Sequence, residues 1–167
     1  MILILEGSDC TGKTTYAKML SEKLGFEILK GSYFEISELG ACGMYKHMMD
    51  LLDNDNIIID RFMHSNLVYG ELFKYPMMTD SQYDDLIDKL DEYAILVYLH
   101  APKGTIEYRI ENRGDDMIKS ENANMILEKY KDVMYGDFRP KFMLSIDTSI
   151  FDIEQATDLI VNIVKNN

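Results

Sequence analysis

An octapeptide near the start of the chain, Gly7 to Thr14, holds the residues best suited to chemistry. It reads Gly-Ser-Asp-Cys-Thr-Gly-Lys-Thr and fits the phosphate-loop pattern G-x-x-x-x-G-K-[ST]. In such a loop the backbone N–H groups form an anion site, Lys13 reaches the β- and γ-phosphates, and the hydroxyl of Thr14 binds Mg²⁺. The motif predicts a site for ATP and Mg²⁺. The residues expected to contact the nucleotide are Gly7, Ser8, Cys10, Thr11, Gly12, Lys13, Thr14 and Thr15.

A carboxylate and a guanidinium, Asp60 and Arg61, follow an apolar run at 57–59. Beside a phosphate loop, a carboxylate can hold a magnesium-bound water, and a guanidinium can neutralise a phosphoryl group. We therefore expect Asp60 to bind the metal, and both residues to act in catalysis together with Lys13. A surface ion pair at the end of a strand is the alternative interpretation.

Basic side chains are scarce, so their positions are informative. The chain has 17 Lys and Arg residues against 29 Asp and Glu residues, for a formal net charge of −12, which makes a nucleic-acid partner unexpected. Arg109 and Arg113 follow Pro102 in a helical stretch and lie four residues apart, hence on one face. We expect the polar loop at 114–121 to act as a short lid that brings Arg109, Arg113 or Lys119 to the transferred phosphoryl group.

The elements that must position these groups alternate along the chain. Expected strands are 2–5, 26–30, 57–60, 94–99 and 142–146, and expected helices are 15–24, 44–52, one that starts at 79, one after Pro102, one that ends near 135, and 152–165. This order predicts a single α/β domain over 1–167, with a five-stranded parallel sheet and helices on both faces, the three-layer P-loop NTPase fold. Ligands of such folds bind beyond the carboxyl ends of the strands.

Composition narrows the class of protein further. Hydrophobic residues make up 47% and charged residues 28%, as is usual for a soluble globular protein. There is no apolar run of roughly 20 residues that could span a membrane, and the apolar start is too short for a signal peptide. We therefore expect a cytoplasmic protein that binds a small-molecule nucleotide and no membrane, and we leave a homodimer open. Cys10 and Cys42 lack a metal-site spacing.

Three segments together resemble the thymidylate kinase family. Residues 5–15 are similar to its E-G-x-D-x-x-G-K-[ST]-T loop, 60–69 to its D-R-[YFH]-x-x-S-x-x-[AV]-[YF] segment, and 108–115 to the R-x-x-x-R-G start of its lid. The likeness follows chain order over nearly the whole sequence. It implies an ATP- and Mg²⁺-dependent kinase that phosphorylates a deoxynucleoside monophosphate, dTMP or a similar one, to the diphosphate.

The resemblance also implies roles for single residues. Asp9 would bind the 3′-hydroxyl of the acceptor sugar, Arg61 the acceptor phosphate, and Tyr69 the deoxyribose face that lacks a 2′-hydroxyl. Ser65 belongs to the same segment and is expected at the acceptor. Thr148, in the loop after the fifth strand, would lie near adenine, and Arg109 would help to bind the nucleotide.

Two departures from the family pattern leave the acceptor open. The interval between Lys30 and Asp60 has no arginine, although this region of the family supplies one, and Gly70 stands where a glutamine usually follows Tyr69. One alternative is a deoxynucleoside kinase that phosphorylates a 5′-hydroxyl, with Glu35 as the general base. Another is a P-loop ATPase or nucleotide-binding protein without a small-molecule acceptor.

Overall fold

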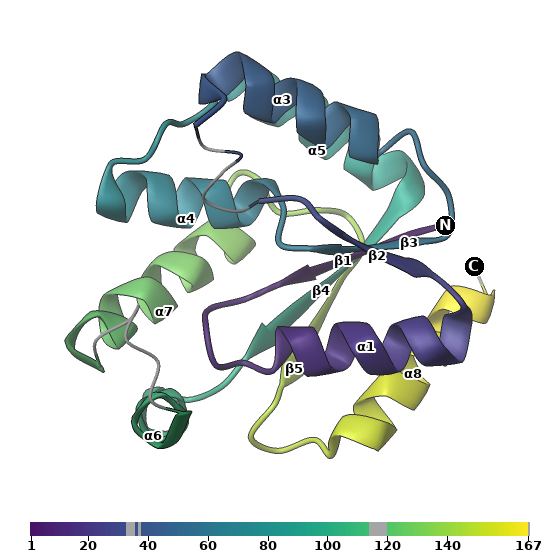
Figure 1. Ribbon diagram of the computed structural model, residues 1–167, viewed down its shortest axis with the longest axis vertical. Coiled ribbons are helices and arrows are strands. Elements are labelled where there is room, and N and C mark those ends of the chain that lie inside the picture. The colour runs from purple at the N-terminus through teal and green to yellow at the C-terminus, as the bar shows by residue number, and fades with distance from the viewer. Residues whose placement is uncertain (33–35, 37, 114–119, 167) are drawn as a thin grey trace.

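A parallel sheet of five strands forms the centre of the molecule (Figure 1). The computed structural model describes residues 1–32, 36, 38–113 and 120–166. The strands lie in the order β2-β3-β1-β4-β5, and each neighbouring pair is parallel. Their bounds are Ile2–Glu6 (β1), Glu27–Lys30 (β2), Ile57–Asp60 (β3), Ala94–His100 (β4) and Met143–Asp147 (β5).

Helices cover both faces of this sheet, which confirms the predicted P-loop fold. The helices are Lys13–Leu24 (α1), Gly40–Leu51 (α3), Met63–Phe73 (α4), Asp80–Tyr93 (α5), Lys103–Arg113 (α6), Ser120–Tyr135 (α7) and Ile153–Asn166 (α8). Helices α1 and α8 pack on one face, and α3, α4, α5 and α7 on the other. None of the helices in the described part of the chain is long and apolar enough to cross a membrane.

The central strands are apolar on both faces because both faces are covered. Ile2 and Ile4 of β1 point into the core beneath α3 to α5, and Leu3 and Leu5 point into the core beneath α1 and α8. Every residue of β1 is buried, Glu6 included. The unbroken apolar runs that predicted buried strands thus belong to the strands nearest the centre.

Helix α4 is an element that the sequence analysis did not expect. Its sequence lacks an amphipathic stripe because seven of its eleven residues are buried, including polar His64, Ser65 and Asn66. Helix α3 also begins earlier than expected, at Gly40, and α1 begins at Lys13, inside the predicted loop. Because α4 is packed on several sides, its sequence does not show the periodic apolar pattern from which helices are predicted.

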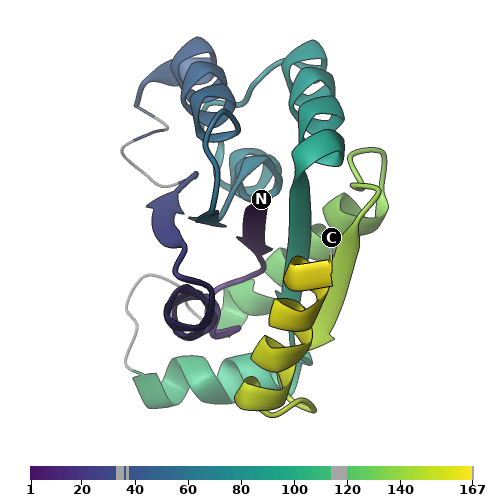
Figure 2. The same cartoon turned by 90° about the vertical axis from the view of Figure 1, so that its right-hand side faces the viewer.

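The carboxyl ends of the strands meet at one edge of the molecule. The phosphate loop leaves β1 there, Asp60 ends β3, and β4 leads through His100 into α6. Figure 2 shows α6 lying crosswise at the bottom, on the side toward which the arrow of β5 points. A small apolar cluster that includes Ile106 and Ala123 joins α6 to α7.

Helix α5 begins with a capping box, whose contribution can be measured. The Thr79 hydroxyl accepts a hydrogen bond from the Gln82 N–H at 3.4 Å, and the Gln82 side chain accepts one from the Thr79 N–H at 3.0 Å. Thr79→Ala should lower the free energy of unfolding by about 1 kcal/mol, measured by urea denaturation. Ser81→Ala, on the exposed side of the same turn, should change it by less than half as much; equal losses would contradict the assignment.

Candidate active site

The phosphate loop is held in an open, anion-binding shape by residues with positive φ. Gly7 has φ 143°, Cys10 has φ 60° and Gly12 has φ 89°. At Gly7 a Cβ atom would lie 2.1 Å from the carbonyl oxygen of Leu99, so only glycine fits between β1 and β4. Helix α1 starts directly after Gly12, and its first N–H groups face the loop with the positive end of the helix dipole.

Lys13 is buried within this loop, with 7% of its surface exposed. Its Nζ donates a hydrogen bond of 2.6 Å to the backbone carbonyl of Ser8. Burial lowers the pKa of Lys13 most and the charge of Arg61 lowers it too, while the carboxylates of Asp9, Asp60 and Glu6 act to raise it. The net result is a pKa of about 7. A phosphate bound in the loop would supply the negative charge that favours the ammonium form.

Asp60 has an unsatisfied oxygen that suits a metal ion. Oδ1 of Asp60 is buried and has no hydrogen-bond donor among the described residues, which is costly without a ligand. Thr14 is exposed at the start of α1, where its hydroxyl is free to bind. A hydroxyl and a carboxylate form the oxygen-only donor set of a Mg²⁺ site, which takes its other ligands from water and nucleotide phosphates. The two residues thus fit the predicted metal.

Arg61 is the centre of the largest hydrogen-bond network at this edge. Its Nη2 donates to Oδ1 of Asp9 at 2.6 Å, and its Nη1 donates to the hydroxyl of Tyr130 at 2.9 Å. Longer contacts of Nη1 reach the Gly7 carbonyl at 3.3 Å, the Tyr69 hydroxyl at 3.4 Å and the Ser65 hydroxyl at 3.5 Å. The backbone of Arg61 has φ 64°, a left-handed conformation that turns its side chain back over the phosphate loop.

Asp9 and Tyr69 lie beside Arg61, and these are the three residues that the resemblance to thymidylate kinases assigns to the acceptor. The hydroxyl of Tyr69 donates to Oδ2 of Asp9 at 2.5 Å, and the guanidinium of Arg61 lies 5.2 Å from the centre of the Tyr69 ring. Burial acts to raise the pKa of Asp9, but the charges of Arg61 and Lys13 and the hydrogen bonds outweigh it, so this pKa is below its usual value. Asp9 is therefore a carboxylate across the neutral range.

Arg109 and Thr148 meet at a separate pocket of about 300 Å³. Nη1 of Arg109 donates to the Cys10 carbonyl at 3.0 Å and to the Thr148 hydroxyl at 2.9 Å, and Nη2 donates to the Thr148 carbonyl at 2.9 Å. The pocket adjoins the phosphate loop, and its lining includes Thr11, Gly12, Thr15, Tyr16 and Phe151. It is thus placed to hold the base of a nucleotide whose phosphates lie in the loop.

Four expectations fall partly or wholly outside the described residues. Glu35, Lys119 and residues 114–119 of the lid loop expected at 114–121 are not described, and Arg113 is described only as the last residue of α6. Helix α7 begins at Ser120, within the range expected for the loop. Ser65 is described and is buried, and its hydroxyl donates to Glu6 at 2.6 Å. Its contact with an acceptor stays a prediction.

Two residues of the network were missed by sequence reasoning. Glu6 is fully buried at the end of β1, and Tyr130 of α7 is fully buried against Arg61. The sequence did contain a signal for Glu6, because it ends an apolar strand. A carboxylate at such a position is rarely buried unless it has hydrogen-bond partners. Tyr130 had no such signal, because it lies 69 residues from Arg61 in the chain.

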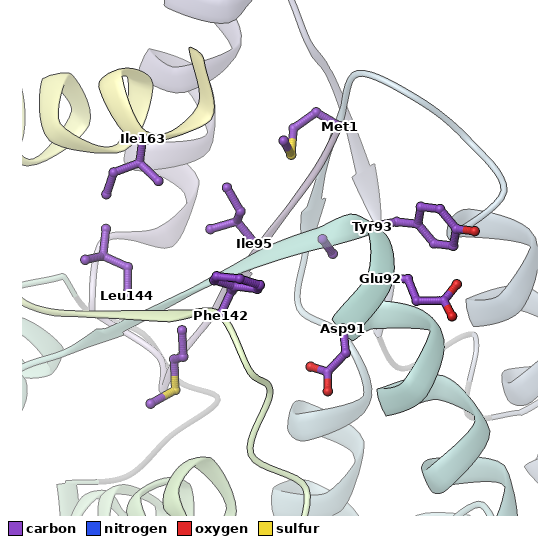
Figure 3. A pocket seen from close by; sticks show the side chains of 10 residues that line it. Met1, Asp91, Glu92, Tyr93, Ile95, Phe142, Leu144 and Ile163 are labelled. Atoms are coloured by element: carbon purple, nitrogen blue, oxygen red, sulfur yellow. The ribbon is translucent and has the colours of Figure 1, made fainter. Parts of the chain in front are cut away.

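A roomier pocket of about 360 Å³ lies at the opposite edge of the sheet (Figure 3). Its walls are formed largely by apolar side chains such as Ile95, Phe142 and Ile163, and its charged lining residues are Asp91 and Glu92. Carboxylates repel phosphate groups, so this pocket is unsuited to a nucleotide. The candidate site is therefore the edge that carries Lys13 and Arg61.

Comparison with known proteins places the chain in a family. No family model matches the sequence. The SPbeta prophage-derived uncharacterized protein YorR of Bacillus subtilis (strain 168) is 44% identical over 134 residues, which cover 80% of this chain and 81% of YorR. A crystal structure of YorR in complex with phosphorylated GDP superposes with a TM-score of 0.92 at 38% identity, covering 99% of this chain and 96% of that one.

More distant relatives are kinases with different acceptors. A probable thymidylate kinase of Methanococcus maripaludis (strain S2) is 28% identical and covers 97% of this chain and 94% of its own length. The deoxyguanosine kinase of Bacillus subtilis is 27% identical, with coverages of 77% and 76%. The structure of a deoxyadenosine kinase from M. mycoides has a TM-score of 0.64 at 22% identity, with full coverage of both chains, and shows the shared fold. The chain belongs to the P-loop nucleotide kinase family that includes YorR.

Proposed function

We propose that this protein uses ATP and Mg²⁺ to phosphorylate the phosphate group of a deoxynucleoside monophosphate, dTMP or a similar one. The observation that carries the proposal is the position of Arg61, whose guanidinium lies beside the phosphate loop and is held by Asp9 at 2.6 Å. A cation fixed next to the donor phosphates is placed to bind a second phosphate, that of the acceptor.

At the donor end, each group has one task. The loop N–H groups and Lys13 bind the β- and γ-phosphates, and the pocket beside Arg109 and Thr148 holds the base. Thr14 and Asp60 would hold Mg²⁺, which when bound neutralises charge on the donor phosphates. Arg109, Arg113 and Lys119 are the candidates for the cation that stabilises the transferred phosphoryl group.

At the acceptor end, Arg61 binds the phosphate and Asp9 receives the 3′-hydroxyl of the sugar. Tyr69 packs against the sugar where a ribose would carry its 2′-hydroxyl. A phosphate oxygen is ionised at neutral pH and needs no strong general base, so catalysis consists of positioning and charge neutralisation. The described residues supply Lys13, Arg61 and Arg109 as the cations for this charge neutralisation.

The second candidate is a deoxynucleoside kinase, and two observations favour it. The interval from 31 to 56 has no arginine, and one curated relative is a deoxyguanosine kinase. In that reaction Glu35 would take the proton from the 5′-hydroxyl. The guanine nucleotide bound by YorR also makes guanine a base to test in both donor and acceptor. Three further points stay predictions from sequence: the alternative function without a small-molecule acceptor, the cytoplasmic location and the homodimer.

A panel of deoxynucleosides and their monophosphates, assayed with MgATP and MgGTP, tests the proposal. A monophosphate should be preferred over its nucleoside by a large factor, since only the monophosphate offers a charged acceptor to the remaining N–H groups of Arg61.

Lys13→Ala should abolish turnover while circular dichroism stays unchanged. Activity within about tenfold of wild type in that variant, a loss under roughly 1.4 kcal/mol, would refute the phosphate-loop assignment.

Discrimination between deoxyribose and ribose should depend on the ring of Tyr69. Tyr69→Ala removes the ring and should raise the kcat/KM for a ribonucleotide relative to its deoxyribonucleotide. Tyr69→Phe keeps the ring but loses the bond to Asp9, so it should keep the discrimination. The idea fails if the ratio of the two kcat/KM values is the same in wild type and Tyr69→Ala.

The lowered pKa of Lys13 predicts a proton linked to nucleotide binding. With a pKa of about 7, most free protein has neutral Lys13 near pH 8, and phosphates favour the ammonium form. Binding should therefore take up a proton, and affinity for MgATP should fall by up to about tenfold per pH unit above neutrality. Calorimetry in buffers of different ionisation enthalpy counts this proton.

Two lysine variants make the measurement specific. Lys13→Arg carries a charged group throughout this pH range and should bind without proton uptake. Lys18→Arg, at an exposed position of α1, should behave as wild type. Proton uptake that persists in Lys13→Arg would show that another group titrates.

A further inference from the structure

Glu6, the last residue of β1, is a fully buried carboxylate that lies under Arg61. Its Oε1 accepts hydrogen bonds from the N–H groups of Phe62 at 2.7 Å and Ser65 at 3.0 Å, and its Oε2 accepts one from the Ser65 hydroxyl at 2.6 Å. These N–H groups belong to the start of α4, where no side chain of the helix itself provides a cap. Glu6 thus caps α4 from a neighbouring strand.

From Glu6 a chain of hydrogen bonds leads to the guanidinium of Arg61. The Ser65 hydroxyl lies 2.8 Å from the Tyr130 hydroxyl, which in turn lies 2.9 Å from Nη1 of Arg61. A guanidinium can only donate, and a carboxylate bonded to three donors can only accept. The Tyr130 hydroxyl must therefore accept from Arg61 and donate to Ser65, and the Ser65 hydroxyl must donate to Glu6.

The reverse direction would leave groups unsatisfied. If the Ser65 hydroxyl donated to Tyr130, Oε2 of buried Glu6 would lose its hydrogen bond, which destabilises a buried carboxylate. Burial raises the pKa of Tyr130 well above its usual value, so the hydroxyl keeps the proton that it donates. The chain has one allowed order, in which the Tyr130 hydroxyl donates to Ser65 and the Ser65 hydroxyl donates to Glu6.

We propose, on the basis of the proposed function, that Glu6 and Tyr130 are positioning residues that orient Arg61 toward the acceptor. Tyr130 fixes Nη1 while Asp9 fixes Nη2, and two anchored nitrogens set the plane of the guanidinium. Glu6 and Tyr130 are both fully buried, so neither touches a substrate. The N–H groups of Arg61 that these anchors leave free can then meet the acceptor phosphate without a search for orientation.

Tyr83 is a control that separates a positioning role of Tyr130 from a merely structural one. Tyr83 is also buried, with 1% of its surface exposed, and its hydroxyl donates to Asn66 of the same helix α4 at 2.5 Å. It makes no contact with Arg61 among those that the structure describes. Tyr130→Phe and Tyr83→Phe therefore each remove one buried hydroxyl, and only the first acts on the guanidinium.

Kinetics of the two variants separate these roles. In Tyr130→Phe the kcat/KM for the acceptor should fall at least about tenfold, or roughly 1.4 kcal/mol, while the KM for ATP changes less than twofold. Tyr83→Phe should leave the kcat/KM for the acceptor and the KM for ATP unchanged. This should hold even if urea denaturation shows that Tyr83→Phe is as destabilised as Tyr130→Phe. Equal effects of the two variants on the acceptor, or an equal effect of Tyr130→Phe on ATP, would overturn the proposal.

Glu6→Gln tests the direction of the chain. The amide has nearly the shape of the carboxylate, but two N–H donors hold its oxygen at the Oε1 position, so its NH₂ faces Ser65. The Ser65 hydroxyl can then no longer donate there, and the order of the chain is lost. The variant should fold and show the same acceptor-specific loss as Tyr130→Phe; wild-type acceptor kinetics in a folded Glu6→Gln would contradict the one-way order.

A readout without turnover keeps this inference separate from the proposed function. In ¹⁵N NMR spectra of the substrate-free protein, the anchored guanidinium of Arg61 should show restricted rotation, with distinct Nη1 and Nη2 signals that Arg61→Lys identifies. Tyr130→Phe should merge them and Tyr83→Phe should not. If the wild type uses a nucleoside, or no acceptor, the proposed function fails while this result still decides the role of Tyr130; unchanged signals in Tyr130→Phe would refute it.

Discussion

A charged guanidinium that is largely removed from water needs several acceptors, and much of the site supplies them to Arg61. Only 18% of its side chain is exposed, and its acceptors come from the phosphate loop, from α4 and from α7. A buried cation of this kind destabilises the fold when its partners are lost. In the proposed function the same network also fixes the geometry of the acceptor side, so stability and function would depend on the same contacts.

The cations of the site differ in how firmly they are held. Lys13 bonds to the carbonyl of Ser8, and Arg109 bonds to Thr148 and to the carbonyl of Cys10, all neutral groups. Arg61 is held by the carboxylate of Asp9. A carboxylate holds a guanidinium more firmly than a neutral carbonyl or hydroxyl does, because both partners of the pair are charged. In the proposed function, a nucleotide would therefore draw Lys13 and Arg109 toward its phosphates, whereas Arg61 would receive the acceptor phosphate in place.

This arrangement also explains where an acidic chain keeps its cations. With a net charge of −12, the protein repels phosphate groups at most of its surface. Lys13, Arg61 and Arg109 gather at the carboxyl edge of the sheet, where their charges offset those of Glu6, Asp9 and Asp60. The pocket at the opposite edge has Asp91 and Glu92 in its lining and keeps the overall sign.

The parts that the sequence predicted are those determined by nearby residues. The apolar run at 57–59 predicted a buried strand, and the loop spacing predicted the positions of Lys13 and Thr14. Helix α4 was missed because buried polar residues such as Asn66 interrupt any apolar stripe, and their partners are distant in sequence. Tyr130 was missed for the same reason. Contacts between residues that are distant in sequence form only in the folded chain, so they leave no pattern in the local sequence.

The central claim is that the acceptor atom belongs to a phosphate, and ³¹P NMR of one reaction mixture tests it directly. The wild-type protein would receive a deoxynucleoside and its monophosphate at equal concentration, with MgATP. The account predicts that the new phosphorus appears as a diphosphate, with coupled α and β signals, while the nucleoside is left unchanged. Growth of the existing monophosphate signal, with the nucleoside consumed and no diphosphate product beyond ADP, would contradict it.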